Sequence, residues 1–487
     1  MPDDLKQKTV TGVSWSFVEQ ILARGVNFVI GIILARLLTP TDYGLVGMLG
    51  IFIAISQLFI DGGLSGALIR TKSPSDRDYS TVYIINLTLS IVFYILLFVI
   101  APFVARYYDQ PILKSMLRVI ALVLVIGSLS SIQGTLLAIR VDFKTKTYIS
   151  ILSSVISGAL GIICAYKGLG VWALVTQTLA ASTVCTIATL AFVRWMPRLV
   201  FSRESFKRLF SYSSKMLAAS TISVIYDNVY PLVIGKRFSA ADVGQYTRAG
   251  QFPGITNGTI TGALNRVAFP VLSQLQDDDE RLLRVYEKYI QLSCFLIFPT
   301  LMGLCGCARP LVSFLLTDKW LDCVPLMQII CFGLLTNALT TINLNLLYVK
   351  GRSDLVLKLE IIKKSIAFAI LFITMFFSIK VMCIGQALYG FIALYLNTHY
   401  SKKILGYGFK PQIKSVTPYF LISLIVLAEA LLSSYLIHNS LASLIISLTI
   451  CPFTYWFIAK TSHLYAYQEA RVIIKDYILP FKNHNSI

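Results

Sequence analysis

The sequence LARLLTPTDYGLV at residues 34–46 returns in altered form as IGKRFSAADVGQY at residues 234–246. The two stretches align without a gap at an offset of 200, which places Asp42 on Asp242. Both follow the pattern basic-x-x-[Ser/Thr]-x-x-Asp-x-Gly. This pattern is typical of a turn in which Thr or Ser starts the turn, Asp caps the next helix and Gly permits close packing. We interpret the pair as an internal duplication rather than as a chance similarity between two loops.

The composition indicates a polytopic membrane protein. Of the 487 residues, 56% are apolar and only 14% are charged, and the mean hydropathy is +0.71. Soluble domains carry about 25% charged residues, so this chain has too few to cover the surfaces of several soluble domains. The net charge of +19 is what basic cytoplasmic loops produce in a membrane protein, and we expect no nucleic-acid partner.

Apolar stretches of spanning length predict fourteen transmembrane helices, since one span takes about 20 residues. The first six stretches lie at 14–35, 43–64, 80–104, 115–137, 147–166 and 170–193. After the basic connector 194–215, six more lie at 213–235, 244–268, 288–308, 323–347, 359–379 and 383–400. The last two lie at 416–437 and 440–459.

The distribution of Lys and Arg predicts how the chain is oriented. Basic residues concentrate in the N-terminus and in every second loop, including Arg70, Arg140 and the 194–215 connector. Cytoplasmic loops carry such an excess. We therefore expect a multi-pass membrane protein with both termini and the 194–215 connector in the cytoplasm.

The duplication predicts the arrangement of these spans. Six spans, an even number, separate the two copies, so both have the same orientation and an axis along the membrane normal relates them. The expected fold is all-α and integral to the membrane, with two parallel six-helix lobes around a central cleft plus two C-terminal helices. The expected parts are an N-terminal lobe at 1–205, a C-terminal lobe at 206–400, and the last two spans with a tail at 401–487.

Polar residues inside spans mark candidate binding positions, because a charge at the bilayer centre costs at least about 2.5 kcal/mol. In the first span several polar or small residues fall on one face of the expected helix, and the seventh span has a matching stripe. The first stripe contains Ser16, Gln20, Arg24, Asn27 and Gly31. The second contains Ser213, Ser220, Ser223, Asp227 and Pro231.

The eighth span is polar as well. It contains Arg248, Gln251, Asn257 and Arg266 around Pro253, with glycines nearby, and we expect a kinked or broken helix that borders a cavity. Arginines in such a cleft suit an anionic cargo, because guanidinium binds phosphate bidentately. The candidate substrate-binding residues are Arg24, Arg248, Arg266, Gln20 and Asn27.

Acidic residues at membrane depth are candidates for coupling to Na⁺ or H⁺. Asp227 lies within the seventh span, Asp61 near the end of the second and Glu360 near the start of the eleventh. The alternative is that these charges pair with one another or reach the interface. We expect no other cofactor. The C-x-C at Cys305 and Cys307 has no second ligand pair and does not indicate a metal site.

An enzyme is a weaker hypothesis. A membrane polysaccharide polymerase, ligase or glycosyltransferase needs donor and acceptor sites on a sizeable loop or domain, and the predicted loops are short. The D-x-D matches at 76–78 and 277–279 lie in short connectors, where solvated charge is the better interpretation, and 277–281 is typical of a helix start. No G-x-x-x-x-G-K-[ST] motif is present, which argues against direct use of ATP.

Four stretches resemble one known family over most of the chain. They are KQKTVTGVSWSFVEQ (6–20), LARLLTPTDYGLV (34–46), LDCVPLMQ (321–328) and VKGRSDLVLKLEIIKKS (349–365). They are similar to the bacterial lipopolysaccharide biosynthesis or oligosaccharide flippase family, the colanic-acid-exporter-like branch of the polysaccharide transport proteins. Lipid II flippases and multidrug and toxin exporters belong to the same superfamily.

The resemblance implies a flippase that moves a polyprenyl-pyrophosphate-linked oligosaccharide across the cytoplasmic membrane by alternating access. It implies that cavity cations on the first and eighth helices are Arg24 and Arg248, and that a groove between the last two spans and the second lobe holds the lipid tail. It also implies as partners the lipid-linked substrate, the bilayer and other polysaccharide assembly proteins. A cation-coupled multidrug exporter of the same superfamily stays open as an alternative, although arginines disfavour its cationic cargo.

Overall fold

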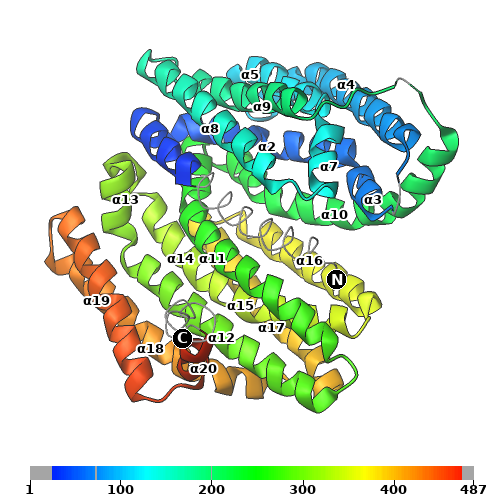
Figure 1. Cartoon of the computed structure of the whole chain (residues 1–487). Helices are drawn as coiled ribbons and strands as arrows, with labels where there is room; N and C mark the ends of the chain where they lie inside the picture. Colours follow the sequence, from blue (N-terminus) through cyan, green and yellow to red (C-terminus); the bar gives the residue numbers. More distant parts are fainter. Residues whose placement is uncertain (1–24, 72–73, 199, 474–487) are drawn as a thin grey trace, which may run out of the picture. The chain divides into compact units, whose positions relative to one another are not determined.

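The computed structural model describes residues 25–71, 74–198 and 200–473, and in these ranges the regular structure is entirely helical (Figure 1). Two compact units divide the chain, unit 1 up to Gly244 and unit 2 from Gln245 onward. The lobe boundary expected near 205 is a different division and stays a prediction.

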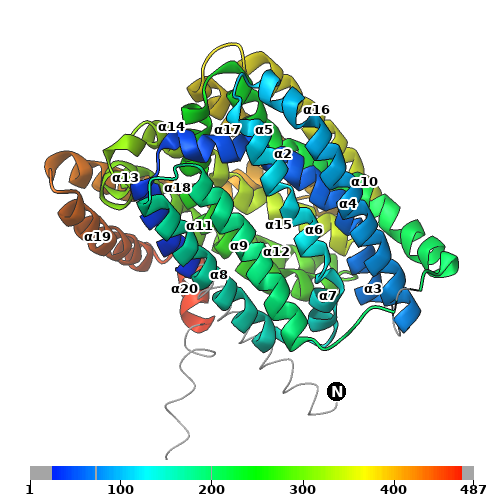
Figure 2. The same ribbon diagram turned by 90° about the horizontal axis from the view of Figure 1, so that it is seen from above.

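Unit 1 holds the helices up to α10. They are an unlabelled helix at Gly25–Leu37, α2 (Pro40–Asp61), α3 (Leu64–Arg70), α4 (Asp76–Tyr107), α5 (Ile112–Ile120), α6 (Leu122–Ser128), α7 (Ser131–Ile139), α8 (Phe143–Tyr166), α9 (Trp172–Phe192) and α10 (Arg203–Arg237). Helices α8 and α9 pack side by side, as both views show (Figures 1 and 2), and α10 packs against α2.

Unit 2 holds the rest of the chain, although the first turn of α11 still belongs to unit 1. The elements are α11 (Ala240–Gln274), α12 (Asp279–Gly306), α13 (Ala308–Leu316), the 3-10 turn η1 (Asp318–Trp320), α14 (Cys323–Leu335), α15 (Asn337–Val349), α16 (Ser353–Thr374), α17 (Ile379–Leu405), α18 (Phe409–Leu436), α19 (Ser440–Thr461) and α20 (Tyr465–Ile473). Its core lies where α12, α15 and α18 meet, around Tyr286, Leu346 and Tyr419.

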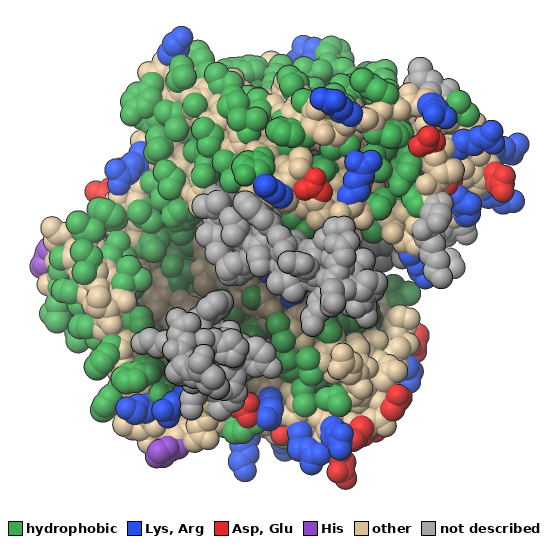
Figure 3. Space-filling view, in the orientation of Figure 1, with side chains coloured by type: hydrophobic (Ala, Val, Ile, Leu, Met, Phe, Trp, Pro, Cys, Tyr) green, Lys and Arg blue, Asp and Glu red, His purple; other side chains and the backbone are tan. Residues whose placement is uncertain are grey.

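The surface of the helices suits a membrane rather than water. Along α4 the large apolar side chains are exposed, with Val99 at 58% and Phe103 at 67%, and Figure 3 shows apolar side chains over much of the visible face. Isolated soluble domains rarely expose apolar surface of this extent. The protein is therefore an all-helical, multi-span membrane protein.

The expected number of fourteen spans is not confirmed. Within the described ranges nine helices are long and apolar enough to cross a membrane, or ten if the bent pair at Ile112–Ser128 and Ser131–Ile139 forms one span. Helices also occupy four further predicted ranges, but three of them, α10, α11 and α16, carry too many polar or charged residues to pass that test, and the fourth is described only at Gly25–Leu37.

Both copies of the repeated turn form the same capped helix start. Thr39 Oγ1 accepts from the backbone N–H of Asp42 at 3.3 Å, and an Asp42 carboxylate oxygen accepts from the Thr39 N–H at 2.9 Å. The equivalent distances for Ser239 and Asp242 are 3.2 and 3.1 Å. The capping expected from the sequence is confirmed in both copies.

Two other local predictions had different outcomes. The acidic run at 277–281 does start a helix, because Asp278 caps α12 and accepts from the Arg281 N–H. The first D-x-D match is not simply solvated charge: Asp78 is only 3% exposed, caps α4 through Ser75 and pairs with Arg208 at 2.6 Å.

Candidate functional site

Two of the candidate substrate-binding residues, Arg24 and Gln20, lie outside the described residues. Of the others, Asn27 is exposed and its amide donates to Ser154 Oγ at 3.0 Å, which connects the first helix to α8. Arg248 and Arg266 both lie on α11.

Helix α11 continues unbroken for 35 residues with Pro253 and Pro270 inside it. Of the expected kinked or broken helix, the break is therefore wrong, and the kink stays a prediction. Each proline removes one backbone hydrogen-bond donor from the helix. A Cβ at Gly250, Gly254 or Gly258 would meet nothing within 4 Å. The glycines therefore do not serve close packing within the described residues.

Arg248 is the buried cation of this helix, with only 6% of its surface exposed. One guanidinium nitrogen donates to Gln251 Oε1, one turn further along, and the guanidinium lies over the Trp320 ring, 5.4 Å from its centroid. Gln245 donates to the Lys319 carbonyl at 2.9 Å and so holds the turn η1, which carries Trp320, against the same helix. The Arg248 guanidinium is therefore held in a fixed place by two elements of unit 2.

Arg266 lies on the same face as Arg248 but is not in the same place. Eighteen residues separate the two, which is five helical turns and about 27 Å. Arg266 is exposed, and its Nε donates to the Gly262 carbonyl at 3.2 Å. The structure therefore does not bring these two arginines together around one small anionic group.

The candidate acids have three different environments. Asp61 ends α2 and accepts from the Gln57 amide at 3.3 Å, next to two glycines with positive φ that separate α2 from α3. Asp227 is exposed on α10. Glu360 on α16 pairs with Lys363 at 2.5 Å, and Lys363 is only 3% exposed. Any ion that binds Glu360 has to compete with this lysine.

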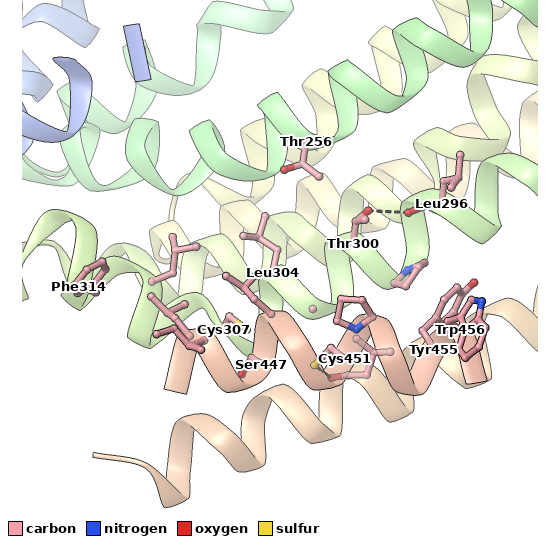
Figure 4. A pocket seen from close by; sticks show the side chains of 18 of the residues that line it. Thr256, Leu296, Thr300, Leu304, Cys307, Phe314, Ser447, Cys451, Tyr455 and Trp456 are labelled. Atoms are coloured by element: carbon pink, nitrogen blue, oxygen red, sulfur yellow. Dashed lines mark hydrogen bonds between the residues drawn. The ribbon is translucent and has the colours of Figure 1, made fainter. Parts of the chain in front are cut away.

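Unit 2 also contains the groove expected beside the last two spans (Figure 4). Helices α12 and α13 form one wall and α19 forms the other, with a volume of about 640 Å³. Figure 4 shows Phe314 near one end, Tyr455 and Trp456 near the other, and Ser447 and Cys451 between them. Nearly all lining side chains are apolar. The sequence indicated the hydrophobicity of residues 416–459 and not the residues of the opposite wall.

A metal centre finds no support in the part of the chain that the structure describes, where no three His, Cys, Asp or Glu side chains cluster. Sequence reasoning missed Trp320, because nothing in the pattern links the 309–322 loop to the eighth span.

The comparisons with known proteins agree on one class. The family model described as "Polysaccharide biosynthesis protein" matches residues 33–325. The succinoglycan biosynthesis transport protein ExoT of Rhizobium meliloti is 27% identical over 72% of this chain and 71% of its own length. The lipopolysaccharide biosynthesis protein WzxC of Escherichia coli is 25% identical over 90% of both chains.

Solved structures share the fold at low sequence identity. The lipid II flippase MurJ in an inward closed conformation has a TM-score of 0.73 at 15% identity and covers 93% of this chain and 99% of its own. An inward-facing multidrug resistance MATE family transporter has a TM-score of 0.62 at 16% identity and covers 80% of this chain and 94% of its own. Likeness at this identity shows a common fold.

Proposed function

The chain belongs to the family of polysaccharide biosynthesis proteins, and on that premise we propose that it is a flippase for a polyprenyl-pyrophosphate-linked oligosaccharide. The names of ExoT and WzxC, a transport protein and a lipopolysaccharide biosynthesis protein, support transport of a saccharide precursor. The flippase with the same fold supports a lipid-linked cargo. The reaction is a translocation without covalent change, so the protein is not an enzyme.

The physical task is to move a polar head group through hydrocarbon. Each unsatisfied polar group in lipid costs several kcal/mol, so a free oligosaccharide faces a barrier of tens of kcal/mol. A polar helix such as α11, on which Thr259 and Arg266 are exposed, offers hydrogen-bond partners that replace water. We propose that the sugars move along such polar surfaces while the isoprenoid tail stays in lipid.

The observation that carries the proposal is the buried guanidinium of Arg248. Arginine is kept at membrane depth at considerable cost, and its flat fork matches a phosphate or pyrophosphate. Gln251 and Trp320 hold the guanidinium in position. We propose that Arg248 binds the pyrophosphate, with Arg24, Gln20, Asn27 and Arg266 contacting the cargo at other positions.

The groove of unit 2 is the proposed site for the tail. Its walls are almost purely apolar, and an isoprenoid chain needs no hydrogen-bond partner. Neither Arg248 nor Arg266, which we assign to the head group, lines it. Head group and tail would therefore bind to separate surfaces.

Alternating access needs a driving force, for which we propose coupling to Na⁺ or H⁺ at Asp227, Asp61 or Glu360. A MATE transporter with the same fold fits an ion-driven cycle. We also propose that the protein lies in the bacterial cytoplasmic membrane with both termini in the cytoplasm, and that it works beside other polysaccharide assembly proteins. A multidrug exporter is less supported, because an arginine-bearing site repels cationic drugs.

The test replaces Arg248 in a strain that lacks the chromosomal gene. Arg248→Ala should reduce export of the saccharide by at least about tenfold, because a charge-assisted bond to phosphate is lost. Arg248→Lys should restore export only in part, since lysine keeps the charge but not the bidentate fork. The readout is the amount of lipid-linked saccharide retained on the cytoplasmic leaflet.

The matched control is Arg284→Gln, which removes an exposed arginine of α12. Immunoblots of the membrane fraction check that all variants accumulate equally. Export at the wild-type level by Arg248→Ala would contradict the assignment of Arg248. Absence of a retained intermediate in the deletion strain, together with a loss of dye efflux, would favour the drug exporter.

A further inference from the structure

Helix α10 is longer than a membrane span requires. It has 35 residues, which is about 52 Å, whereas the hydrocarbon core is about 30 Å thick. Its N-terminal part follows directly from the segment that connects α9 to α10. Residues 201–210 therefore lie at or beyond the membrane interface, and we call them the α10 extension.

One face of the α10 extension packs against the start of α4, which belongs to the same unit. The Ser202 N–H donates to Thr81 Oγ1 at 3.0 Å, and Arg208 pairs with the buried Asp78 at 2.6 Å. Leu209 is 3% exposed and packs in a cluster with Tyr79. These contacts hold the extension on the start of α4, so its other face has a fixed direction.

The other face combines aromatic rings with cations. The Phe206 ring stacks on Phe210 with centroids 5.2 Å apart and contacts Phe201 at 6.3 Å. Phe201 is 53% exposed and Phe210 is 44% exposed. Arg203 and Lys207 lie one helical turn apart, and both are exposed.

These residues share one hollow. Arg203, Glu204, Phe206, Lys207 and Phe210 line a depression of about 620 Å³. Neither of its cations forms an ion pair with an acid of the described residues, and Glu204 contributes the one negative charge. Figure 3 shows Lys and Arg side chains gathered at the end of unit 1 where α10 begins in Figure 1.

We propose that the α10 extension is a docking surface for an anionic phospholipid of the adjacent leaflet. Lys and Arg beside a membrane gain about 1 kcal/mol each from anionic lipid, and aromatic side chains favour the headgroup region. The phosphate binds Arg203 and Lys207, and the glycerol and upper acyl region pack on Phe206 and Phe210. Free phosphate has no apolar part that could pack on the phenyl rings, whereas a phospholipid has both a phosphate and acyl chains. The combination of cations and rings therefore fits a lipid.

The bound lipid would anchor the connection between α9 and α10 to the membrane surface. This inference does not depend on the transported cargo. It concerns a face of unit 1 that contains none of the residues assigned to substrate or ion.

The experiment uses the full chain, purified in detergent and titrated with dioleoylphosphatidylglycerol or dioleoylphosphatidylcholine, and counts bound lipids by native mass spectrometry. The wild type should bind phosphatidylglycerol more tightly. Replacing both cations, Arg203→Gln with Lys207→Gln, should weaken that binding by about 30-fold and leave phosphatidylcholine unchanged. Phe206→Ser with Phe210→Ser should weaken binding of both lipids.

Arg284→Gln is the matched control, because it removes an exposed cation from α12 that has no aromatic neighbours in the hollow, and it should bind both lipids like the wild type. Gel filtration and circular dichroism check that each variant folds, and Lys207→Gln alone should weaken binding by about fivefold. Unchanged phosphatidylglycerol binding by the double glutamine variant would overturn the proposal. So would displacement of the lipid by an equal concentration of inorganic phosphate.

Discussion

Gly44 and Gly244 are the two residues at which the copies of the repeated turn meet. A Cβ on Gly44 would lie 1.6 Å from the Ala240 carbonyl oxygen, and a Cβ on Gly244 would lie 1.9 Å from the Pro40 carbonyl oxygen. At the offset of 200, Pro40 corresponds to Ala240, so the contact is reciprocal. In each copy, the absence of a Cβ at the glycine leaves room for the backbone of the other copy. This close approach explains why both copies have glycine at this position.

We predict that Gly44→Ala and Gly244→Ala are each strongly destabilising. Backbone rather than a flexible side chain occupies the space, so the helices must separate, at a cost above the roughly 1–3 kcal/mol of ordinary overpacking. The measurement is the midpoint of thermal unfolding of each purified variant in detergent.

Gly66→Ala is the control for that experiment. Gly66 lies within α3, and a Cβ there meets nothing within 4 Å. Alanine in a helix interior is more favourable than glycine by about 0.5–1 kcal/mol, so this variant should unfold at the same or a higher temperature. Equal midpoints for Gly44→Ala and Gly66→Ala would show that the close approach is not present in the protein.

At the scale of elements, a buried polar network holds α18 to the rest of unit 2. Tyr286 of α12 donates to Asn343 Oδ1 of α15 at 2.7 Å, and the Asn343 amide donates to Gln412 Oε1 of α18 at 2.9 Å. Ser401 of α17 donates to the same Asn343 oxygen at 2.5 Å. All four side chains are fully buried. Because α18 leads into α19, the network also positions one wall of the apolar groove.

We predict that Asn343→Leu destabilises unit 2 by about 3 kcal/mol, because Tyr286 and Gln412 lose their shared partner while still buried. The readout is the temperature at which a thiol-reactive dye labels Cys294, which is fully buried on α12. Labelling of the exposed Cys185 supplies a constant background.

Ser433→Ala is the matched control within α18. Ser433 is half-buried, and within the described part of the chain its hydroxyl forms hydrogen bonds only with Ser443 of α19, at 3.2 Å. Its removal should therefore cost no more than about 0.5 kcal/mol. Labelling of Cys294 at the same temperature in Asn343→Leu and in the wild type would mean that the network does not fasten α18.

At the scale of the whole molecule, the features that could be predicted from the sequence are helix starts and apolar helices, because both depend on residues that are close together along the chain. The helix start at Pro40 was predictable because Thr39 and Asp42 form its cap three residues apart, and the same rule held at Ser239. Hydropathy located the apolar helices because each is a continuous run. Helices α10 and α11 were located in the same way, from the apolar stretches 213–235 and 244–268, although both helices extend beyond these stretches into more polar sequence.

Contacts between distant segments were not predictable from one sequence. Asn343 and Gln412 are 69 residues apart, and nothing in the sequence around either one distinguishes it from other polar residues in helices. Arg248 was selected as a candidate because it is a charge in an apolar run, but Trp320, which lies against it, had no such signal. The 46° bend between α6 and α7 was missed for the same reason, since the chain there stays apolar throughout.

The orientation of the whole chain rests on charge alone. The end of α17 and the start of α18 are basic, with Lys402, Lys403, Lys410 and Lys414, whereas the turn between α18 and α19 at 437–439 contains no Lys or Arg. Cytoplasmic loops carry the excess of basic residues, so this turn should face outward and the C-terminus inward.

Reporter proteins fused at two positions, one before and one after α19, test that orientation. Green fluorescent protein fused after Ile487 should fluoresce, because it folds in the cytoplasm, and alkaline phosphatase fused after Asn439 should be active, because it needs the oxidising exterior. The exchanged reporters at the same two positions should be silent and serve as controls. Of the apolar helices in the described ranges, α19 alone lies between the two fusion points, so the same reporter working at both positions would mean that α19 does not cross the membrane. The reverse pattern would mean that the basic loops lie outside, and the arrangement of the remaining spans would be inverted with them.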